Sequence, residues 1–202
     1  MTTGQLRCGD QYQELVFDAL QQANTCVRDC EFVQCQFRGC DFSAATLVGC
    51  RFIDCDFCDC NFNTVRFERG TMRGCQFQSC KVTGVNWTLL DWRSVILEAP
   101  FSFVQCDLSY SVFQRLVLPQ LLLHECVVHE VDFSECDLTA ADFHSCDLSG
   151  AYFRHTKLDK CNFQQAYNFS NDPTQNSVTA ARFSSPEVLN LLAAFRIKVD
   201  CD

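Results

Sequence analysis

A large apolar residue recurs at every fifth position through most of the chain. Phe, Leu, Met, Val or Trp occupies each such position from 27 to 97, and the series resumes from 103 to 163 after a slip of one residue around Glu98-Ala99-Pro100. The two stretches together hold 28 pentads, which chance would not produce. Because an internal repeat restricts the possible folds more than any local pattern does, this period is the first constraint on the chain.

Two residues before each of these central residues lies a second restricted position. It is Cys in thirteen pentads and mostly Ala, Val, Ser, Thr or Gly in the others, whereas the remaining three positions are mostly polar. A helix would show a period of about 3.6 residues and a long strand a period of 2. A period of five with two inward residues therefore predicts a short extended piece followed by a turn, repeated many times.

Several pentads carry a small residue, then Asp, then Leu or Phe. Cys106-Asp107-Leu108-Ser109-Tyr110 and Cys146-Asp147-Leu148-Ser149-Gly150 show the pattern clearly. Between about residues 25 and 168 the chain resembles the pentapeptide-repeat family. The resemblance implies an all-β fold, a right-handed quadrilateral β-helix with four pentads, or 20 residues, in each coil.

The repeat also predicts how the chain is divided. We expect a solenoid of seven to eight coils over residues 1–168, with a one-residue register shift near 98–102. With that shift, one face stacks Leu97 on Phe77, and the next face stacks Phe103 on Val82. Coils separated by one strand spacing, about 4.8 Å, would make seven coils a rod of about 35 Å.

The C-terminal segment, residues 169–202, is expected to form a loop, a short helix and a short strand. Ser185-Pro186-Glu187 is a typical helix start, with an N-cap serine, proline at the first helical position and an acid in the first turn. Such a helix would either cap the open solenoid end or pair with a second copy. The apolar face predicted for dimerisation consists of Val188, Leu191, Leu192 and Phe195.

The 17 cysteines and four histidines are expected to be structural. The cysteines recur mainly at spacings of five, without a C-x-x-C pair, and lie where the repeat requires a small residue, so they should pack as small hydrophobes. His124 and His144 lie one coil apart and should form a stacked surface pair. We expect no metal, no cofactor and no catalytic residue, and therefore no enzyme.

Charge is distributed unevenly along the chain. The net charge is −9, which disfavours direct binding of nucleic acid and favours basic partners. Residues 28–81 carry equal numbers of acids and bases, whereas residues 103–150 carry eight acids and one base, Arg115. The candidate partner-binding acids are Asp107, Glu125, Glu130, Asp132, Glu135, Asp137, Asp142 and Asp147.

Two readings of these acids remain open. An Asp before the central residue can bond the turn backbone, which would make it structural. Glu125, Glu130 and Glu135 occupy other positions, and that explanation does not cover them. One coil before the four successive aspartates, the same positions hold an apolar belt that is either a contact surface or inert: Val112, Val117, Leu122 and Val127.

Finer similarities point to antibiotic-resistance members of the family. Gly84-Val85-Asn86-Trp87-Thr88 with Trp92, and Ala181-Arg182-Phe183-Ser184, are similar to the albicidin-resistance members, and the layout more distantly resembles microcin-immunity and quinolone-resistance members. Those proteins are dimers joined at their C-terminal ends that act on DNA gyrase by mimicking duplex DNA. Quinolone-resistance members have loops between coils, and the single extra residue near Pro100 favours the loop-free members instead.

The resemblance therefore implies a bacterial homodimer that binds DNA gyrase and protects it from a topoisomerase poison. The alternative is a scaffold or partner-binding rod with no topoisomerase target. No apolar stretch is long enough to span a membrane, and the first residues lack the pattern of a signal peptide. We accordingly expect a cytoplasmic protein that binds neither a membrane nor nucleic acid directly.

Overall fold

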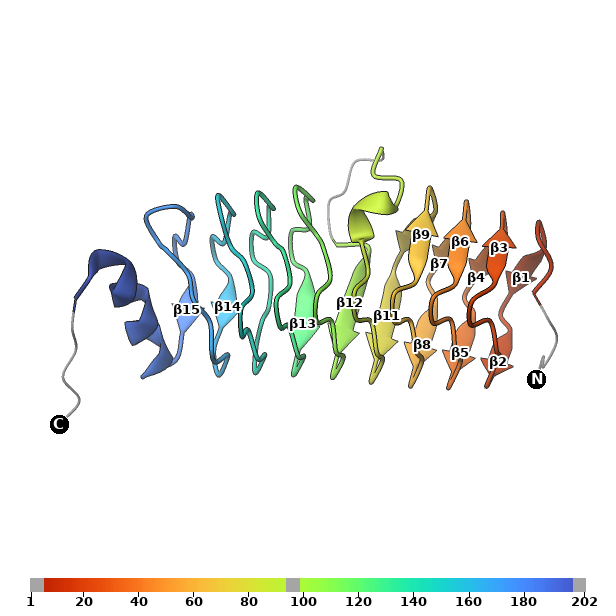
Figure 1. The fold of residues 1–202 in the computed structure, drawn as a ribbon, viewed down its shortest axis with the longest axis horizontal. Helices are drawn as coiled ribbons and strands as arrows, with labels where there is room; N and C mark the ends of the chain where they lie inside the picture. Colours follow the sequence, from red (N-terminus) through yellow and green to blue (C-terminus); the bar gives the residue numbers. More distant parts are fainter. Residues whose placement is uncertain (1–5, 94–98, 198–202) are drawn as a thin grey trace.

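The chain winds into a rod of stacked coils, with its two ends at opposite ends of the rod (Figure 1). The computed structural model describes residues 6–93 and 99–197. It is a right-handed quadrilateral β-helix of about eight turns, as the family resemblance implied. All strand pairs are parallel, because each strand pairs with the equivalent strand of the next coil. We number the four faces 1 to 4 in the order in which the chain visits them.

Short parallel strands form three of the four faces. Face 1 carries β1 (Gln11–Gln13), β4 (Glu31–Val33), β7 (Arg51–Ile53) and β10 (Thr71–Arg73). Face 2 carries β2 (Val16–Asp18), β5 (Gln36–Arg38), β8 (Asp56–Cys58), β11 (Cys75–Gln78), β12 (Phe101–Val104), β13 (Leu122–His124), β14 (Asn162–Phe163) and β15 (Arg182–Phe183). Face 4 carries β3 (Cys26–Arg28), β6 (Thr46–Val48) and β9 (Arg66–Glu68). Face 3 is a ladder of single-residue bridges that runs from Gln21 to Tyr167.

The central residues fill the interior in columns. On face 2 the rings of Phe17, Phe37, Phe57, Phe77 and Phe103 stack with centroids 4.7–5.0 Å apart. That distance is close to the spacing of paired strands, so each ring lies directly above the ring of the previous coil. Burial of these columns is the main stabilisation of the rod, because a single coil has no core of its own.

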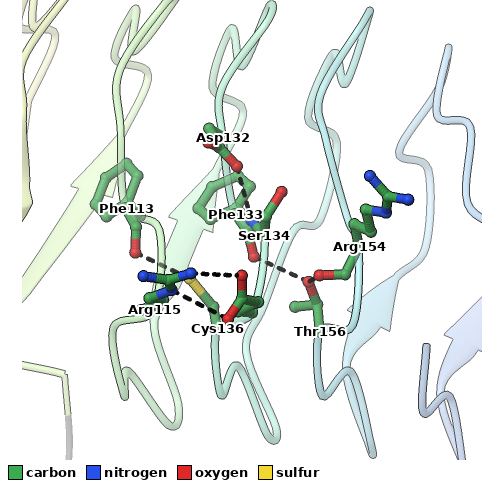
Figure 2. Close-up of polar contacts among 9 residues, drawn as sticks. Phe113, Arg115, Asp132, Phe133, Ser134, Cys136, Arg154 and Thr156 are labelled. Carbon is green, nitrogen blue, oxygen red and sulfur yellow. Dashed lines mark hydrogen bonds and ion pairs between the residues drawn. The ribbon is translucent and has the colours of Figure 1, made fainter. Parts of the chain in front are cut away.

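The second inward position is where the thirteen repeat cysteines lie, and all thirteen are buried. This confirms their packing role. The structure adds a contact that the pattern did not predict, since the side chain at this position donates a hydrogen bond to a carbonyl of the preceding coil. Cys136 Sγ lies 3.0 Å from the Phe113 carbonyl oxygen, and Thr156 Oγ1 lies 2.9 Å from that of Phe133 (Figure 2). Burial raises the pKa of the Cys136 thiol to about 12, so it stays protonated and can donate.

The break near Pro100 differs from the one-residue shift that the repeat predicted. Phe77 pairs with Phe103 and Lys81 with Asp107, so equivalent residues are 26 apart there, instead of 20 as elsewhere. Six residues are inserted, which is one pentad plus one residue. A repeat of five residues cannot reveal the insertion of a whole pentad. An insertion of six residues therefore looks in the sequence like a slip of one.

The insertion changes the predicted columns downstream. Phe103 stacks on Phe77 of face 2, and not on Val82 of face 3 as expected. Leu97 was expected in that place on face 2, and it lies outside the described residues. The yellow-green segment that includes η1 (Trp87–Leu89) stands out from the row of coils (Figure 1). Trp92 Nε1 donates to the Trp87 carbonyl oxygen at 3.0 Å and fastens the start of this excursion. The rod therefore has a loop, and the expectation of a loop-free rod was wrong.

The C-terminal end extends the ladder beyond residue 168. Lys157 bridges to Ser177, and β14 pairs with β15, so that Phe183 stacks on Phe163 at 5.0 Å. After this coil comes η2 (Glu187–Phe195), a 3₁₀ helix that lies across the end of the rod (Figure 1). The strand expected near Arg196–Val199 lies partly outside the described residues. Within the described ranges, no helix is long and apolar enough to cross a membrane.

Candidate partner-binding surface

The aspartates before the central residues shape the turns. The Oδ1 atoms of Asp107, Asp132, Asp137, Asp142 and Asp147 each accept the backbone N–H two residues later, at 2.8–3.2 Å. Figure 2 shows this contact between Asp132 and Ser134. A short carboxylate that closes a turn in this way stabilises the coil whether or not it also meets a partner. These five acids therefore have a structural role.

The three glutamates occupy the corners of the coil. Glu125, Glu130 and Glu135 have φ angles of 54°, 54° and 61°, the left-handed conformation that the turn requires there. Their side chains accept hydrogen bonds only from other side chains. Glu125 Oε2 accepts from Gln105 Nε2 at 2.8 Å, and Glu130 Oε2 accepts from the Tyr152 hydroxyl at 2.7 Å. The glutamates close no turn, so the carboxylates of Glu125 and Glu130 are available to a partner.

Two of the candidate acids form ion pairs with bases one coil further on or back. Lys157 Nζ lies 3.0 Å from Asp137 Oδ2, and Arg115 Nε lies 3.0 Å from Glu135 Oε2. The hydrogen bond from Arg115 lowers the pKa of Glu135. For Asp137, partial burial would raise the pKa, but hydrogen bonds from Thr139 and Lys157 outweigh it and lower the pKa. These pairs reduce the negative charge on faces 1 and 4.

Asp147 is the most firmly held of the eight acids. His129 Nε2 lies 2.9 Å from its Oδ2, and Asn168 Nδ2 donates to its Oδ1 at 3.0 Å. Partial burial favours a raised pKa, but the hydrogen bonds from His129, Asn168 and Ser149 dominate and lower the pKa of Asp147 to about 2. The carboxylate is therefore ionised and fixed in direction at neutral pH.

Once the bases are included, the acidity of the C-terminal half is concentrated on one face. Within the described stretch 101–183, face 1 holds two acids and two bases, and face 4 holds three acids, Asp172 included, and two bases. Face 2 holds two acids and one base. Face 3 with its edge toward face 4 holds Asp107, Glu130 and Asp147 and no lysine or arginine. Sequence counting had indicated four successive aspartates, one on each face.

The apolar belt lies one coil before the ring of aspartates. Val112 bridges to Asp132, Val117 to Asp137, Leu122 to Asp142 and Val127 to Asp147. Val117 is 51% exposed, and Leu122 and Val127 are each 36% exposed. Because the four residues point from four faces, the belt cannot act as one flat contact surface, and each residue belongs to a different face.

The predicted dimerisation residues lie on η2. Val188, Leu191 and Leu192 are half-buried, and Leu191 packs against the solenoid core, whereas Phe195 is 54% exposed. Leu189 and Ile197 are also exposed on this segment. Part of the segment thus covers the end of the rod, and its outer side presents apolar groups to solvent.

The sites of possible chemistry are few. His124 and His144 stack with ring centroids 5.1 Å apart, which confirms the predicted surface pair. Among the residues that the structure describes, no group of three or more His, Cys, Asp or Glu side chains could hold a metal ion. A polar groove of about 380 Å³ follows β5, β8, β11 and β12 on face 2, with Gln36, Arg38, Asp56, Cys58 and Gln76 in its lining.

Comparison with known families agrees with the coil geometry. The profile described as "Pentapeptide repeat region" matches residues 30–100 and 96–163, and the two matches meet at the insertion. The chain belongs to the pentapeptide-repeat family. No curated protein gives a significant sequence match.

Two solved structures of the family show the same fold. A trypsin-treated variant of QnrB1, a plasmid-mediated fluoroquinolone resistance protein, has 16% identity over 92% of this chain and 100% of its own, with a TM-score of 0.57. HetL, involved in heterocyst differentiation regulation in the cyanobacterium Nostoc sp., has 14% identity over 84% of this chain and 85% of its own, with a TM-score of 0.60. At these identities the likeness concerns the fold, which serves different roles in the two proteins.

Proposed function

We propose that this pentapeptide-repeat protein is a non-enzymatic DNA mimic of the bacterial cytoplasm that binds DNA gyrase and protects it from a topoisomerase poison. The observation that carries the proposal is a straight rod whose C-terminal half presents, along one face, carboxylates that no lysine or arginine neutralises. Duplex DNA is also a rod, with one negative charge per roughly 1.7 Å of its axis, and a basic DNA-binding surface would accept a rod of similar sign. The charge on this protein is sparser, so shape must contribute as well.

The loop at the insertion bears on which drug is involved. Its presence removes the argument against a quinolone-type poison, and the fold shared with a fluoroquinolone resistance protein supports including quinolones among the candidates. The rival role, a scaffold with a different partner, is supported by the equally good fold match to a regulator of differentiation.

A supercoiling assay tests the proposal. Purified gyrase is assayed with and without the protein, in the presence and absence of a quinolone or albicidin, and we expect the protein to restore supercoiling. The Glu125→Lys/Glu130→Lys variant should lose this effect, because it reverses charge at both edges of face 3. It should fold normally, since Lys160 occupies the same turn position with a φ of 61°. A wild-type protein that alters neither gyrase nor its poisoning contradicts the proposal.

We also propose that the protein is a homodimer joined through η2. Exposed Phe195, with its half-buried neighbours Val188, Leu191 and Leu192, would then supply an apolar patch that a two-fold axis uses twice. Dimerisation would place both acidic halves at the centre of one longer rod. Light scattering should give twice the 23.0 kDa chain mass, and Phe195→Asp should give a folded monomer. A wild-type mass near 23.0 kDa at micromolar concentration would contradict the dimer and would mean that η2 only caps the rod.

A further inference from the structure

Three of the four tyrosines of the chain are exposed along the edge between face 3 and face 4 in the acidic half. Tyr110 is 67% exposed, Tyr152 54% and Tyr167 45%. Tyr167 continues the face 3 ladder Asp107–Val127–Asp147, and Tyr110 precedes Glu130 by one coil at the edge toward face 4. Tyr152 lies on face 4, one coil after Asp132, and its hydroxyl reaches Glu130 at the edge. Exposed tyrosines are normal singly, but three along one edge of the rod, together with exposed Val127, are typical of protein-binding surfaces.

We propose that this surface, which we call the tyrosine face (Asp107, Tyr110, Val127, Glu130, Asp147, Tyr152 and Tyr167), docks an arginine-bearing segment of a partner protein. Charge complementarity identifies the occupant. Face 3 and its edge toward face 4 supply the three carboxylates and, in the described stretch 101–183, hold no lysine or arginine; Tyr152 is the one member that lies on face 4. A guanidinium stacks on a phenol ring and at the same time pairs with a neighbouring carboxylate, whereas an ammonium is a strongly hydrated point charge.

The side chains of this surface are already held in position. The Tyr152 hydroxyl donates to Glu130 Oε2 at 2.7 Å, so ring and carboxylate are fixed together. Gly150 makes room for that arrangement, because a Cβ at this residue would lie 2.4 Å from Glu130 Oε1. Asp147 is held from the other side by His129 and Asn168. Fewer rotamers are therefore lost on binding, which favours affinity and specificity.

The ladder sets the spacing of the groups that a partner would meet. Asp107, Val127, Asp147 and Tyr167 follow one another at one coil each, about 4.8 Å apart. Carboxylates thus alternate with apolar side chains along the axis of the rod. An extended segment with an arginine at every second or third residue would match two carboxylates separated by about 10 Å.

This inference shares with the proposed function only the class of partner, a basic protein surface. It does not depend on the partner being gyrase. We would measure binding of two fluorescent homopeptides of equal length, one of arginine and one of lysine, by anisotropy at constant ionic strength. Both peptides carry the same charge, so a purely electrostatic surface would bind them alike. The tyrosine face predicts tighter binding of the arginine peptide, by roughly two- to fivefold for each ring engaged.

Matched variants locate the effect. Tyr110→Asn with Tyr152→Thr should lower the preference for arginine to the roughly two- to fivefold that the remaining ring, Tyr167, can supply; asparagine tolerates the left-handed φ of 63° at residue 110. Two control variants should keep the preference for arginine. Val117→Thr removes exposed apolar area on face 1. Glu14→Gln removes one carboxylate at the far end of the rod, at the turn position that Glu130 occupies in its own coil, with a φ of 53°. Tyr152→Phe, which keeps the ring, should retain most of the preference and guards against misfolding of the double variant.

Equal affinity of the wild type for the two peptides overturns the inference, as does a preference that is unchanged in the Tyr110→Asn/Tyr152→Thr variant. The two proposals fail separately. A protein without effect on gyrase that still prefers the arginine peptide contradicts only the proposed function. A protein that protects gyrase and shows no arginine preference contradicts only the tyrosine face.

Discussion

The two halves of the rod, before and after the insertion, build the same coil with different turns. Residues 11–78 form strands of three or four residues on faces 1, 2 and 4, and only face 3 has single-residue bridges. After residue 105 most positions on all four faces are single-residue bridges followed at once by a turn. The residue before each central residue also differs between the halves. It is Gln, Glu, Arg or Thr at most strand positions of the first half, and it is Asp in five pentads of the second.

The comparison shows how to interpret the acids. An aspartate at that position accepts the N–H two residues later and favours the tight turn, and face 3 of the first half, with Asp41 and Asn61, already behaves this way. Much of the acidity of the second half is therefore used in turns. The charge that remains for a partner is on the corner glutamates and on the face without bases.

The largest expected effect is in the aromatic columns of the first half. Phe57 is stacked between Phe37 and Phe77 and is 1% exposed, so Phe57→Ala should lower the free energy of unfolding by about 3–5 kcal/mol. Leu123→Ala, in the same column of the second half, should lower it by about 2–5 kcal/mol. Urea denaturation would measure both values.

Hydrogen exchange would show where the damage spreads. Each coil contacts only its neighbours, so the added exchange should stay near the substituted coil and within its own half. Uniform loosening of residues 11–183 in either variant would mean that the two halves unfold as one unit, and the distinction between them would then have no energetic meaning.

The repeat predicted the core well because the inward positions follow from sterics alone. Phe57 and Cys136 could be assigned to the interior from their place in the pentad. The face on which Leu123 lies could not be assigned, because an insertion of six residues and a slip of one are equivalent in a period of five. The last coil was missed because Asn168–Thr179 interrupts the pattern, although Phe183 returns to it 20 residues after Phe163.

The candidate surface was predicted less well than the core. The sequence located the acidic half, but a sum of charges along the chain does not show that Lys157 pairs with Asp137, although the 20-residue period that predicts the His124–His144 pair also places these two residues one coil apart. The period also places Tyr110 one coil before Glu130. The contact of Tyr152 with Glu130 could not be predicted, because the two residues are 22 apart and meet only through the direction of the Tyr152 side chain.

The smallest expected effect is a difference in acid sensitivity between the halves. Asp147 has a pKa of about 2 in the folded chain, below the value of about 3.9 for an unfolded aspartate. Its ionised form is therefore stabilised by folding. This stability is fully present above about pH 4 and is lost as the pH falls toward 2, because the unfolded chain then binds the proton more readily.

Asp147→Asn should accordingly lower the Tm at pH 7 by no more than about 2–4 °C, since the site is partly open to solvent. The difference from the wild type should shrink as the pH falls from 4 to 2. Asp41→Asn is the matched control: Asp41 occupies the same position of face 3 in the first half and closes the same turn with Ser43, without the contacts that Asp147 makes with His129 and Asn168. Thermal melting of the three proteins between pH 2 and 7 measures the effect. If Asp41→Asn and Asp147→Asn show the same pH dependence, the turn alone holds the carboxylate, and the two halves do not differ in acid sensitivity.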